Sequence, residues 1–315
     1  MKKLITGILG LMWMLNSGFA QQIQRFNPDT VITYRLDDVP ITGERISSEY
    51  FIKLILRDTS FYRAFSNMKK FSFTAENRVN TYDKKNKIEG RIYRQVKHDN
   101  SGPYKMTTLA KEESGKLLKK NGKYQLETVE MFDYIFMNPY NSDFVSSPAS
   151  GTNESYKEKL KTLIFRPGHP IKGLAFAVSG IGSKTQLFSA NMRQYYNYSY
   201  SSGVYLDSIP VYRFKVIMKP NLSNWTKDGI MIKELTTIFD KRNMQILGRY
   251  IDMKLDAPLM YDFDVQMNIE LGYFDKNSTL LPTKISYQGN WDYLMHKQER
   301  ASFLILHKGY VRGHK

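Results

Sequence analysis

The sequence contains no cysteine among its 315 residues. Disulfide bonds are therefore excluded, and so is a lipid anchor attached to an N-terminal cysteine, the usual lipoprotein route. The folded state has to be stabilised by a hydrophobic core instead. Hydrophobic residues make up 42% of the chain, which is ample material for a core at this length.

Recognisable motifs of catalysis and metal binding are also absent. The five histidines form no His-Glu-x-x-His or His-x-His motif, so a zinc site has no local support. No Gly-x-Ser-x-Gly nucleophile elbow is present. The segment 179–185 has the glycines of a phosphate-binding loop but lacks the adjacent Gly-Lys-Ser/Thr, and we interpret it as a turn. We therefore predict a non-enzymatic protein with no catalytic residues, no metal and no cofactor.

The N-terminus has the three regions of a secretory signal peptide. A basic Lys2-Lys3 pair precedes the apolar stretch 4–15, and small residues follow up to Ala20. An apolar run of about a dozen residues is too short to cross a membrane as a helix, which needs roughly 20. We therefore predict that residues 1–20 are removed after Ala20. The mature chain, 21–315, would lack a transmembrane segment and would be periplasmic or secreted.

Acidic residues are scarce relative to basic ones. The chain has 46 Lys and Arg against 30 Asp and Glu, a formal charge of +16, and +14 remains without Lys2-Lys3. An exported protein rarely meets nucleic acid, so we expect a lipid, an anionic glycolipid or an envelope protein as the partner of this surface. The lysine clusters near 84–87, 116–123 and 157–161 are interpreted as soluble turns.

Alternation of apolar and polar residues with a period of two dominates the C-terminal half of the chain. The longest run, 261–271, has apolar residues on one face and polar residues on the other. Clean alternation on successive segments with short links is typical of an antiparallel meander. The strands predicted there cover 212–218, 231–239, 251–255, 261–271, 284–288 and 302–307.

Helical spacing is found mainly near the N-terminus. Apolar residues within 46–55 and 61–68 each fall on one helical face, and Asp58-Thr59-Ser60 supplies a cap for the second helix. A strand is predicted from Phe71 and a short helix over 129–137. Turns are predicted at 82–86, at Asn121-Gly122, at 239–243 and at 274–277, and a loop over 138–152.

No linker divides this pattern, so a single domain over 21–315 is predicted. Its fold class is α+β with mostly antiparallel β structure. The expected architecture is an open or incomplete barrel of long meandering strands that covers a few helices.

The arrangement resembles a family of exported Bacteroidetes proteins of unknown function. The resemblance lies in the N-terminal helix pair and in four segments, Tyr-Arg-Phe-Lys-Val at 212–216, Gly-Arg-Tyr-Ile at 248–251, Tyr-Asp-Phe-Asp-Val at 261–265 and Leu-Pro-Thr-Lys-Ile-Ser-Tyr at 281–287. Those proteins are similar to the lipoprotein-carrier superfamily. The resemblance implies an incomplete antiparallel barrel whose concave face is covered by helices and can hold acyl chains.

The leading hypothesis is a periplasmic binding module that holds an acyl chain, a lipid or a partner segment on the concave face of its sheet. The candidate cavity-lining residues are Ile251, Met253, Phe263, Val265 and Met267. These side chains could equally belong to a sealed core, because a fold does not fix a function. An envelope scaffold or interaction protein without a ligand cavity is the alternative.

A carbohydrate-active hydrolase is a further alternative. Asp262 and Asp264 lie on one face of a predicted strand, and a carboxylate separation of about 7 Å suits glycoside hydrolysis. The polar alternation continues past both residues, so we interpret them as part of a hydrated strand face. The tyrosines at 195, 196, 198 and 200 could stack on sugars but are also typical of a strand.

Overall fold

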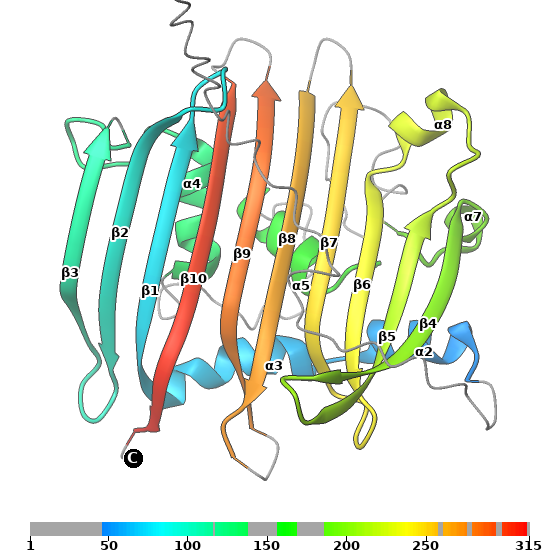
Figure 1. Ribbon diagram of the computed structural model, residues 1–315, viewed down its shortest axis with the longest axis horizontal. Coiled ribbons are helices and arrows are strands. Elements are labelled where there is room, and N and C mark those ends of the chain that lie inside the picture. The colour runs from blue at the N-terminus through cyan, green and yellow to red at the C-terminus, as the bar shows by residue number, and fades with distance from the viewer. Residues whose placement is uncertain are drawn as a thin grey trace, which may run out of the picture.

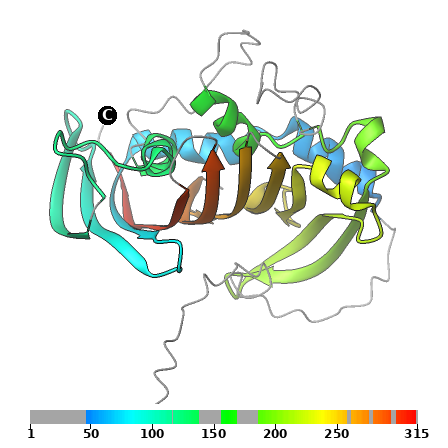
Figure 2. The same ribbon diagram turned by 90° about the horizontal axis from the view of Figure 1, so that it is seen from above.

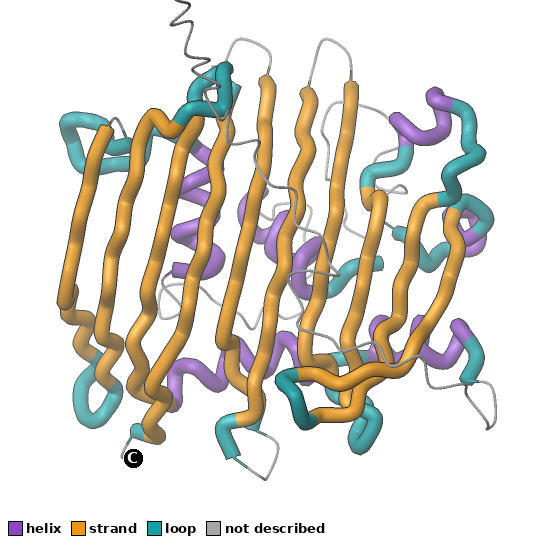
Figure 3. The backbone as a smooth tube through the Cα atoms, in the orientation of Figure 1, coloured by secondary structure: helices purple, strands orange, loops and turns teal. Residues whose placement is uncertain are grey.

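The computed structural model describes residues 46–115, 117–137, 156–168, 186–257, 261–275, 279–293 and 298–313. The predicted signal peptide, the loop 138–152 and the segment 179–185 lie outside these ranges. Within the described residues ten strands form one sheet (Figure 1; Figure 3). They are β1 Phe71–Tyr82, β2 Ile88–Asp99, β3 Lys105–Gly115, β4 Tyr196–Tyr205, β5 Ile209–Met218, β6 Ile232–Asp240, β7 Ile246–Ala257, β8 Tyr261–Tyr273, β9 Leu280–Tyr293 and β10 Glu299–Arg312.

The strand order is β3-β2-β1-β10-β9-β8-β7-β6-β5-β4, and every neighbouring pair is antiparallel. Strands β4 to β10 follow one another as a meander, while β10 returns to pair with β1. The sheet is open, because β3 and β4 lie at its two edges. The predicted α+β class with mostly antiparallel β structure is confirmed, as are the six strands predicted in the C-terminal half.

Helices cover one face of this sheet, which we call the inner face (Figure 2). The chain between the edge strands β3 and β4 carries several of them across that face. The described helical segments are α2 Ser48–Arg57, α3 Ser60–Asn67, η1 Met68–Lys70, α4 Glu127–Phe132, the π-helical turn η2 Asp133–Met137, α5 Tyr156–Phe165, α7 Ala190–Arg193 and α8 Asn224–Gly229.

The two N-terminal helices form where the apolar spacing predicts them. The carboxylate of Asp58 accepts hydrogen bonds from the backbone N–H groups of Ser60, at 3.0 Å, and Phe61, at 3.1 Å. These bonds satisfy donors that the first turn of α3 leaves without intrahelical partners. The predicted cap is therefore confirmed, and it fixes the corner between α2 and α3.

The predicted turns at 82–86 and at Asn121-Gly122 are formed by the expected residues, whereas the predicted turn 274–277 lies partly outside the described residues. Asp83 Oδ1 accepts hydrogen bonds from the N–H groups of Lys85 and Lys87, and Asn86 has a φ of 60°. Gly122 has a φ of 78°, in the left-handed region that glycine enters without steric cost. The turn at 82–86 joins β1 to β2 and sets their register, whereas the Gly122 turn closes an isolated antiparallel bridge between Leu118 and Tyr124.

One contact between the layers is not visible in any local pattern. The two carboxylate oxygens of Glu299, the first residue of β10, accept hydrogen bonds from the N–H groups of Glu127 and Thr128, each at 2.9 Å. Glu299 is buried and caps the first turn of α4 from a distance of about 170 positions in sequence. The predicted helix over 129–137 is thereby tied to the sheet as α4 and η2.

Candidate functional site

The five candidate residues of β7 and β8 lie together on the inner face of the sheet. Ile251 pairs with Met267 and Met253 pairs with Val265 across the two strands. All five side chains are between 1% and 4% exposed. The period of two thus places them on the face that the helices cover, as predicted.

Strand β9 extends this surface with residues that the sequence analysis did not select. Trp291 pairs with Phe263, and their rings stack with centroids 4.9 Å apart. The Trp291 Nε1–H donates to the Tyr287 hydroxyl at 2.5 Å, so the two aromatic side chains are linked along the strand. We call the combined surface the apolar wall, which consists of Ile251, Met253, Phe263, Val265, Met267, Tyr287 and Trp291.

A glycine makes room for the aromatic pair in the wall. A Cβ atom at Gly289 would lie 2.2 Å from the Tyr287 hydroxyl and 2.6 Å from its Cζ atom. The Tyr287 ring therefore lies over the backbone of residue 289, where only glycine leaves enough space.

Replacement of Gly289 by alanine is expected to displace the Tyr287 ring and to lower the free energy of unfolding by about 1–3 kcal/mol. Gly203→Ala is the matched control, because the nearest atom to a Cβ at this strand glycine is 4.0 Å away. The control should change the stability by less than about 0.5 kcal/mol. Urea unfolding of both variants measures the difference, and equal stabilities would contradict the packing described.

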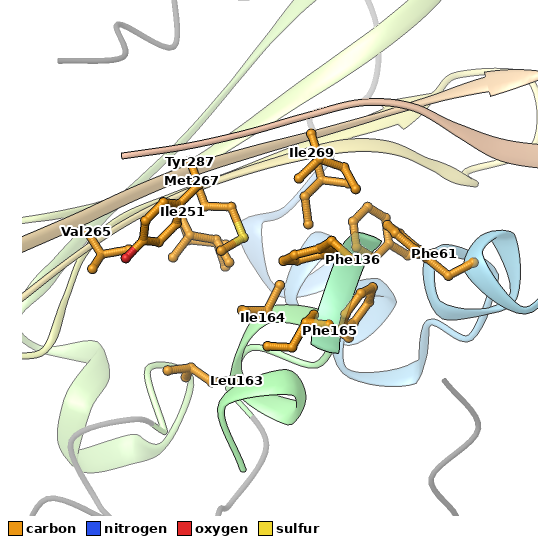
Figure 4. Close-up of a cluster of buried hydrophobic side chains, with 14 of the residues drawn as sticks. Phe61, Phe136, Leu163, Ile164, Phe165, Ile251, Val265, Met267, Ile269 and Tyr287 are labelled. Atoms are coloured by element: carbon orange, nitrogen blue, oxygen red, sulfur yellow. The ribbon is translucent and has the colours of Figure 1, made fainter. Parts of the chain in front are cut away.

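The helical layer packs on one part of the wall. Figure 4 shows Ile251, Met267 and Ile269 pointing from the sheet toward Ile164 and Phe165 of α5. The Phe165 ring is 4.7 to 6.0 Å from the rings of three further phenylalanines, which fill the space between α3, η2 and α5. These are Phe61, Phe65 and Phe136.

Arg249 fixes α5 over the wall. Its guanidinium donates to the carbonyl oxygens of Phe165, at 2.9 Å, and Ile164, at 3.3 Å, and lies 4.3 Å from the centre of the Phe61 ring. The last carbonyls of a helix have no intrahelical donors, so a buried cation at this position caps α5. Burial lowers the pKa of Arg249 to about 10, against the opposing field of Asp58. The side chain remains charged at neutral pH and joins β7, α3 and α5.

The opposite, outer face carries the polar residues of the same strands. Asp264 Oδ1 accepts a hydrogen bond from Gln266 Nε2 at 2.7 Å, and the same nitrogen donates to Asp252 at 3.2 Å. Asn268 donates to Glu270 at 2.8 Å, and burial raises the pKa of Glu270 against the attraction of the nearby Lys284 ammonium. Hydrogen bonds between neighbouring polar side chains of β7 and β8 therefore fix the positions of these groups on the outer face.

The prediction of a uniformly hydrated outer face is wrong for the centre of β8. Gln266 and Asn268 are buried, although Asp262 is exposed. A period of two assigns residues to a face but does not determine what covers that face, and buried amides are stable where they find hydrogen-bond partners. Asp262 and Asp264 lie on this face, on the other side of the sheet from the apolar wall.

Two hollows lined by described residues lie apart from the apolar wall. One, of about 330 Å³, lies beside the capping carboxylate of Glu299, with Arg300, Lys119 and Tyr82 in its lining. The other, of about 640 Å³, is a shallow depression whose lining includes Arg78, Arg91, Tyr93 and Glu112 of strands β1, β2 and β3. Charged and polar side chains dominate both.

No family model, curated protein or solved structure matches this chain. Over the described ranges, no three histidine, aspartate or glutamate side chains gather in a group that could hold a metal ion. The helices in those ranges include none that is both long enough and apolar enough to span a membrane.

The β9 members of the wall could have been found from the sequence. Ile285, Tyr287, Gly289 and Trp291 alternate with polar residues in the same way as the residues of β8. The predicted strand ends at residue 288, so it does not include Gly289 and Trp291. No sequence pattern indicates Arg249 as part of the site. Alternation assigns apolar residues to the inner face, and a charged residue at such a position departs from it.

Proposed function

We propose that the protein is an exported, non-enzymatic binding module that holds an acyl chain or lipid against the inner face of its sheet. In this proposal the signal peptide ends at Ala20, the protein acts in the periplasm, and the sheet curves into an incomplete barrel like that of the lipoprotein carriers. The observation that carries it is the apolar wall, in which three consecutive strands contribute a continuous apolar and aromatic surface.

The proposed ligand position is the part of the apolar wall around Met253 and Val265, which lies farthest from Phe61. Val265 lies at the far end of the row from Phe61 (Figure 4), and Met253 pairs with it. Val265 also pairs with Gly289, and the Tyr287 ring lies over Gly289, so the side chains around Val265 continue as an apolar and aromatic surface. Methionine adapts its shape to irregular apolar ligands, so Met253 can adjust to a chain that lies beside Val265.

Native mass spectrometry of the protein, purified under mild conditions from the envelope of the cells that produce it, tests this proposal. The wild type is expected to carry an additional acyl-containing mass. Val265→Phe fills the proposed position and is expected to reduce the bound fraction at least about tenfold, a difference of about 1.4 kcal/mol. Val79→Phe is the matched control, because Val79 is equally buried on the inner face, on β1.

Circular dichroism verifies that both variants are folded, and Met253→Phe replaces Val265→Phe if the latter is not. Wild-type protein without any bound mass would overturn the proposal, and so would equal occupancy in the Val265 and Val79 variants.

An envelope scaffold or interaction protein without a ligand cavity is the second candidate. Dense packing of the neighbouring core favours it: the rings of Phe132 and Phe303 stack with centroids 4.2 Å apart, and Tyr287 packs on Phe132 at 4.7 Å. In that case an envelope protein or an anionic glycolipid would bind the basic surface of the protein. The absence of a bound mass in the experiment above would favour this function.

A further inference from the structure

Trp225 is the most exposed large apolar side chain of the described residues, at 89%. It belongs to α8, a helix of six residues in the connection between β5 and β6 (Figure 1). An indole ring combines a large apolar surface with one N–H donor, and tryptophan usually buries most of that surface. A tryptophan held in solvent therefore requires an explanation.

The helix that carries Trp225 is anchored at both ends. Ser223 Oγ accepts a hydrogen bond from the Thr226 N–H at 3.2 Å, which caps the first turn. The ammonium of Lys233 donates to the carbonyl oxygens of Lys227, at 2.5 Å, and Ile230, at 2.6 Å. Since these bonds hold both ends of α8, the indole is presented from a fixed position.

The chain after α8 is buried in the sheet. Ile230, Met231 and Ile232 are each no more than 2% exposed, and the Met231 carbonyl accepts a hydrogen bond from the Lys254 N–H at 2.9 Å. Helix α8 thus lies against β7, next to the strand segment that contains Met253. Trp225 is therefore held at the end of the sheet where Met253 lies, which is the part of the apolar wall farthest from Phe61.

We propose that Trp225 anchors the protein to the surface of a lipid bilayer, with its indole ring at the level of the headgroups. This inference rests on the proposed function, because a carrier of acyl chains has to meet a membrane to load and unload. Tryptophan is enriched at membrane interfaces, where one part of the ring is in an apolar environment and the N–H stays hydrated.

The surroundings of Trp225 favour a bilayer over a protein partner. Asn221, Ser223 and Asn224 are exposed next to it, so the apolar area is about that of one ring, 150–250 Å². A stable protein interface buries about 800 Å² on each partner. One apolar group inserted in the interface gives only weak binding, so stable attachment needs a second attraction.

Positive charge supplies that second attraction. The segment from Lys219 to Lys233 contains three lysines and one aspartate. Lys233 is bound to the carbonyls of α8, which leaves Lys219 and Lys227 for the bilayer, and the chain without Lys2-Lys3 has a formal charge of +14. Anionic headgroups attract basic residues that lie close to the bilayer surface. We therefore expect binding to require anionic lipid and to weaken with added salt.

Vesicle binding by the purified mature chain, residues 21–315, tests the inference. Co-sedimentation with vesicles of phosphatidylethanolamine and phosphatidylglycerol is expected for the wild type. Trp225→Ser should weaken the partition at least about tenfold, which corresponds to about 1.4 kcal/mol. Trp225→Phe should retain part of the affinity. Leu206→Ser is the matched control, because Leu206 is 51% exposed in the β4–β5 turn and should be dispensable.

Quenching by brominated lipid locates the indole directly. A Trp291→Phe background removes the buried tryptophan at the wall, and the remaining emission at Trp225 should shift to the blue and be quenched. Failure of the wild type to bind vesicles, or equal binding by the Trp225→Ser and Leu206→Ser variants, would overturn the inference. The acyl mass bound to the wild type is measured without vesicles, so failure of the membrane anchor and failure of the proposed function are distinguishable.

Discussion

Replacing Phe51 by alanine is expected to lower the free energy of unfolding by about 3–5 kcal/mol, the usual cost of removing a fully buried phenylalanine. Phe51 is 0% exposed in the middle of α2. Its ring centroid is 5.0 to 5.7 Å from four rings of the sheet, and the shortest of these contacts is a stacked one. The four are Tyr200, Tyr212, Phe214 and Phe239.

These four rings come from β4, β5 and β6, so Phe51 holds α2 on the part of the sheet next to its β4 edge. A truncated side chain would leave a cavity that the surrounding rings could close only by leaving their present rotamers. The loss of stability should therefore appear in the cooperative unfolding of the whole sheet.

The neighbouring residue supplies the control for this experiment. Tyr50 is 42% exposed in the same helix, and Tyr50→Ala should cost less than about 1 kcal/mol. Urea unfolding followed by circular dichroism measures both variants. Equal stability of the two would show that α2 does not dock on the sheet through Phe51.

Local sequence patterns predict the elements on both sides of the Phe51 contact but not the contact itself. Helical spacing identified the α2 face that contains Phe51, and alternation identified Phe214 and Phe239 as residues of strands. Neither pattern showed that these rings meet. Contacts between distant elements depend on the order of strands in the sheet, and the pairing of β1 with β10 has no local signal.

The candidate site follows the same division. A period of two was sufficient to put Met253 and Val265 on one face, because each strand residue alternates between two sides. It did not reveal that Glu299 caps α4 or that Lys233 holds α8, since both contacts join segments with no common periodicity. Trp225 was not selected either, because exposure is a property of the assembled surface.

Stability is expected to fall steeply as the pH decreases below about 6.5, the ordinary pKa of histidine. Two buried histidines of the inner face are responsible. The ring of Phe73 stacks on His98 at 4.5 Å and meets the edge of His307 at 5.6 Å, and His98 Nδ1 is 3.0 Å from the Tyr104 hydroxyl.

Burial is the main reason that both histidines remain neutral in the folded protein. It lowers the pKa of His98 to about 4, with a further contribution from the positive charge of Arg94. It lowers the pKa of His307 to about 3, with a contribution from His98. An unfolded chain has no such restriction and takes up a proton at each histidine near its ordinary pKa.

The direction of the pH effect on the free energy of unfolding follows from the number of protons that each state binds. Below pH 6.5 the unfolded state binds up to two more protons than the folded state, so the free energy of unfolding decreases by up to about 2.7 kcal/mol per pH unit. At pH 5 the two histidines together would cost about 4 kcal/mol. Most carboxyl groups titrate near pH 4, so the interval from 6.5 to 5 reports mainly on histidines.

The double variant His98→Gln, His307→Gln separates this effect from ordinary destabilisation. It should be less stable than the wild type at pH 7.5, because glutamine does not reproduce the ring packing around Phe73. The slope of its free energy of unfolding against pH between 6.5 and 5 should nevertheless be smaller, by an amount that corresponds to up to two bound protons. In each single variant the slope should decrease by the amount of one proton. Urea unfolding at several pH values gives these slopes. Since the slope is independent of the stability at pH 7.5, parallel curves for the wild type and the double variant would show that the buried pair is not the source of acid sensitivity.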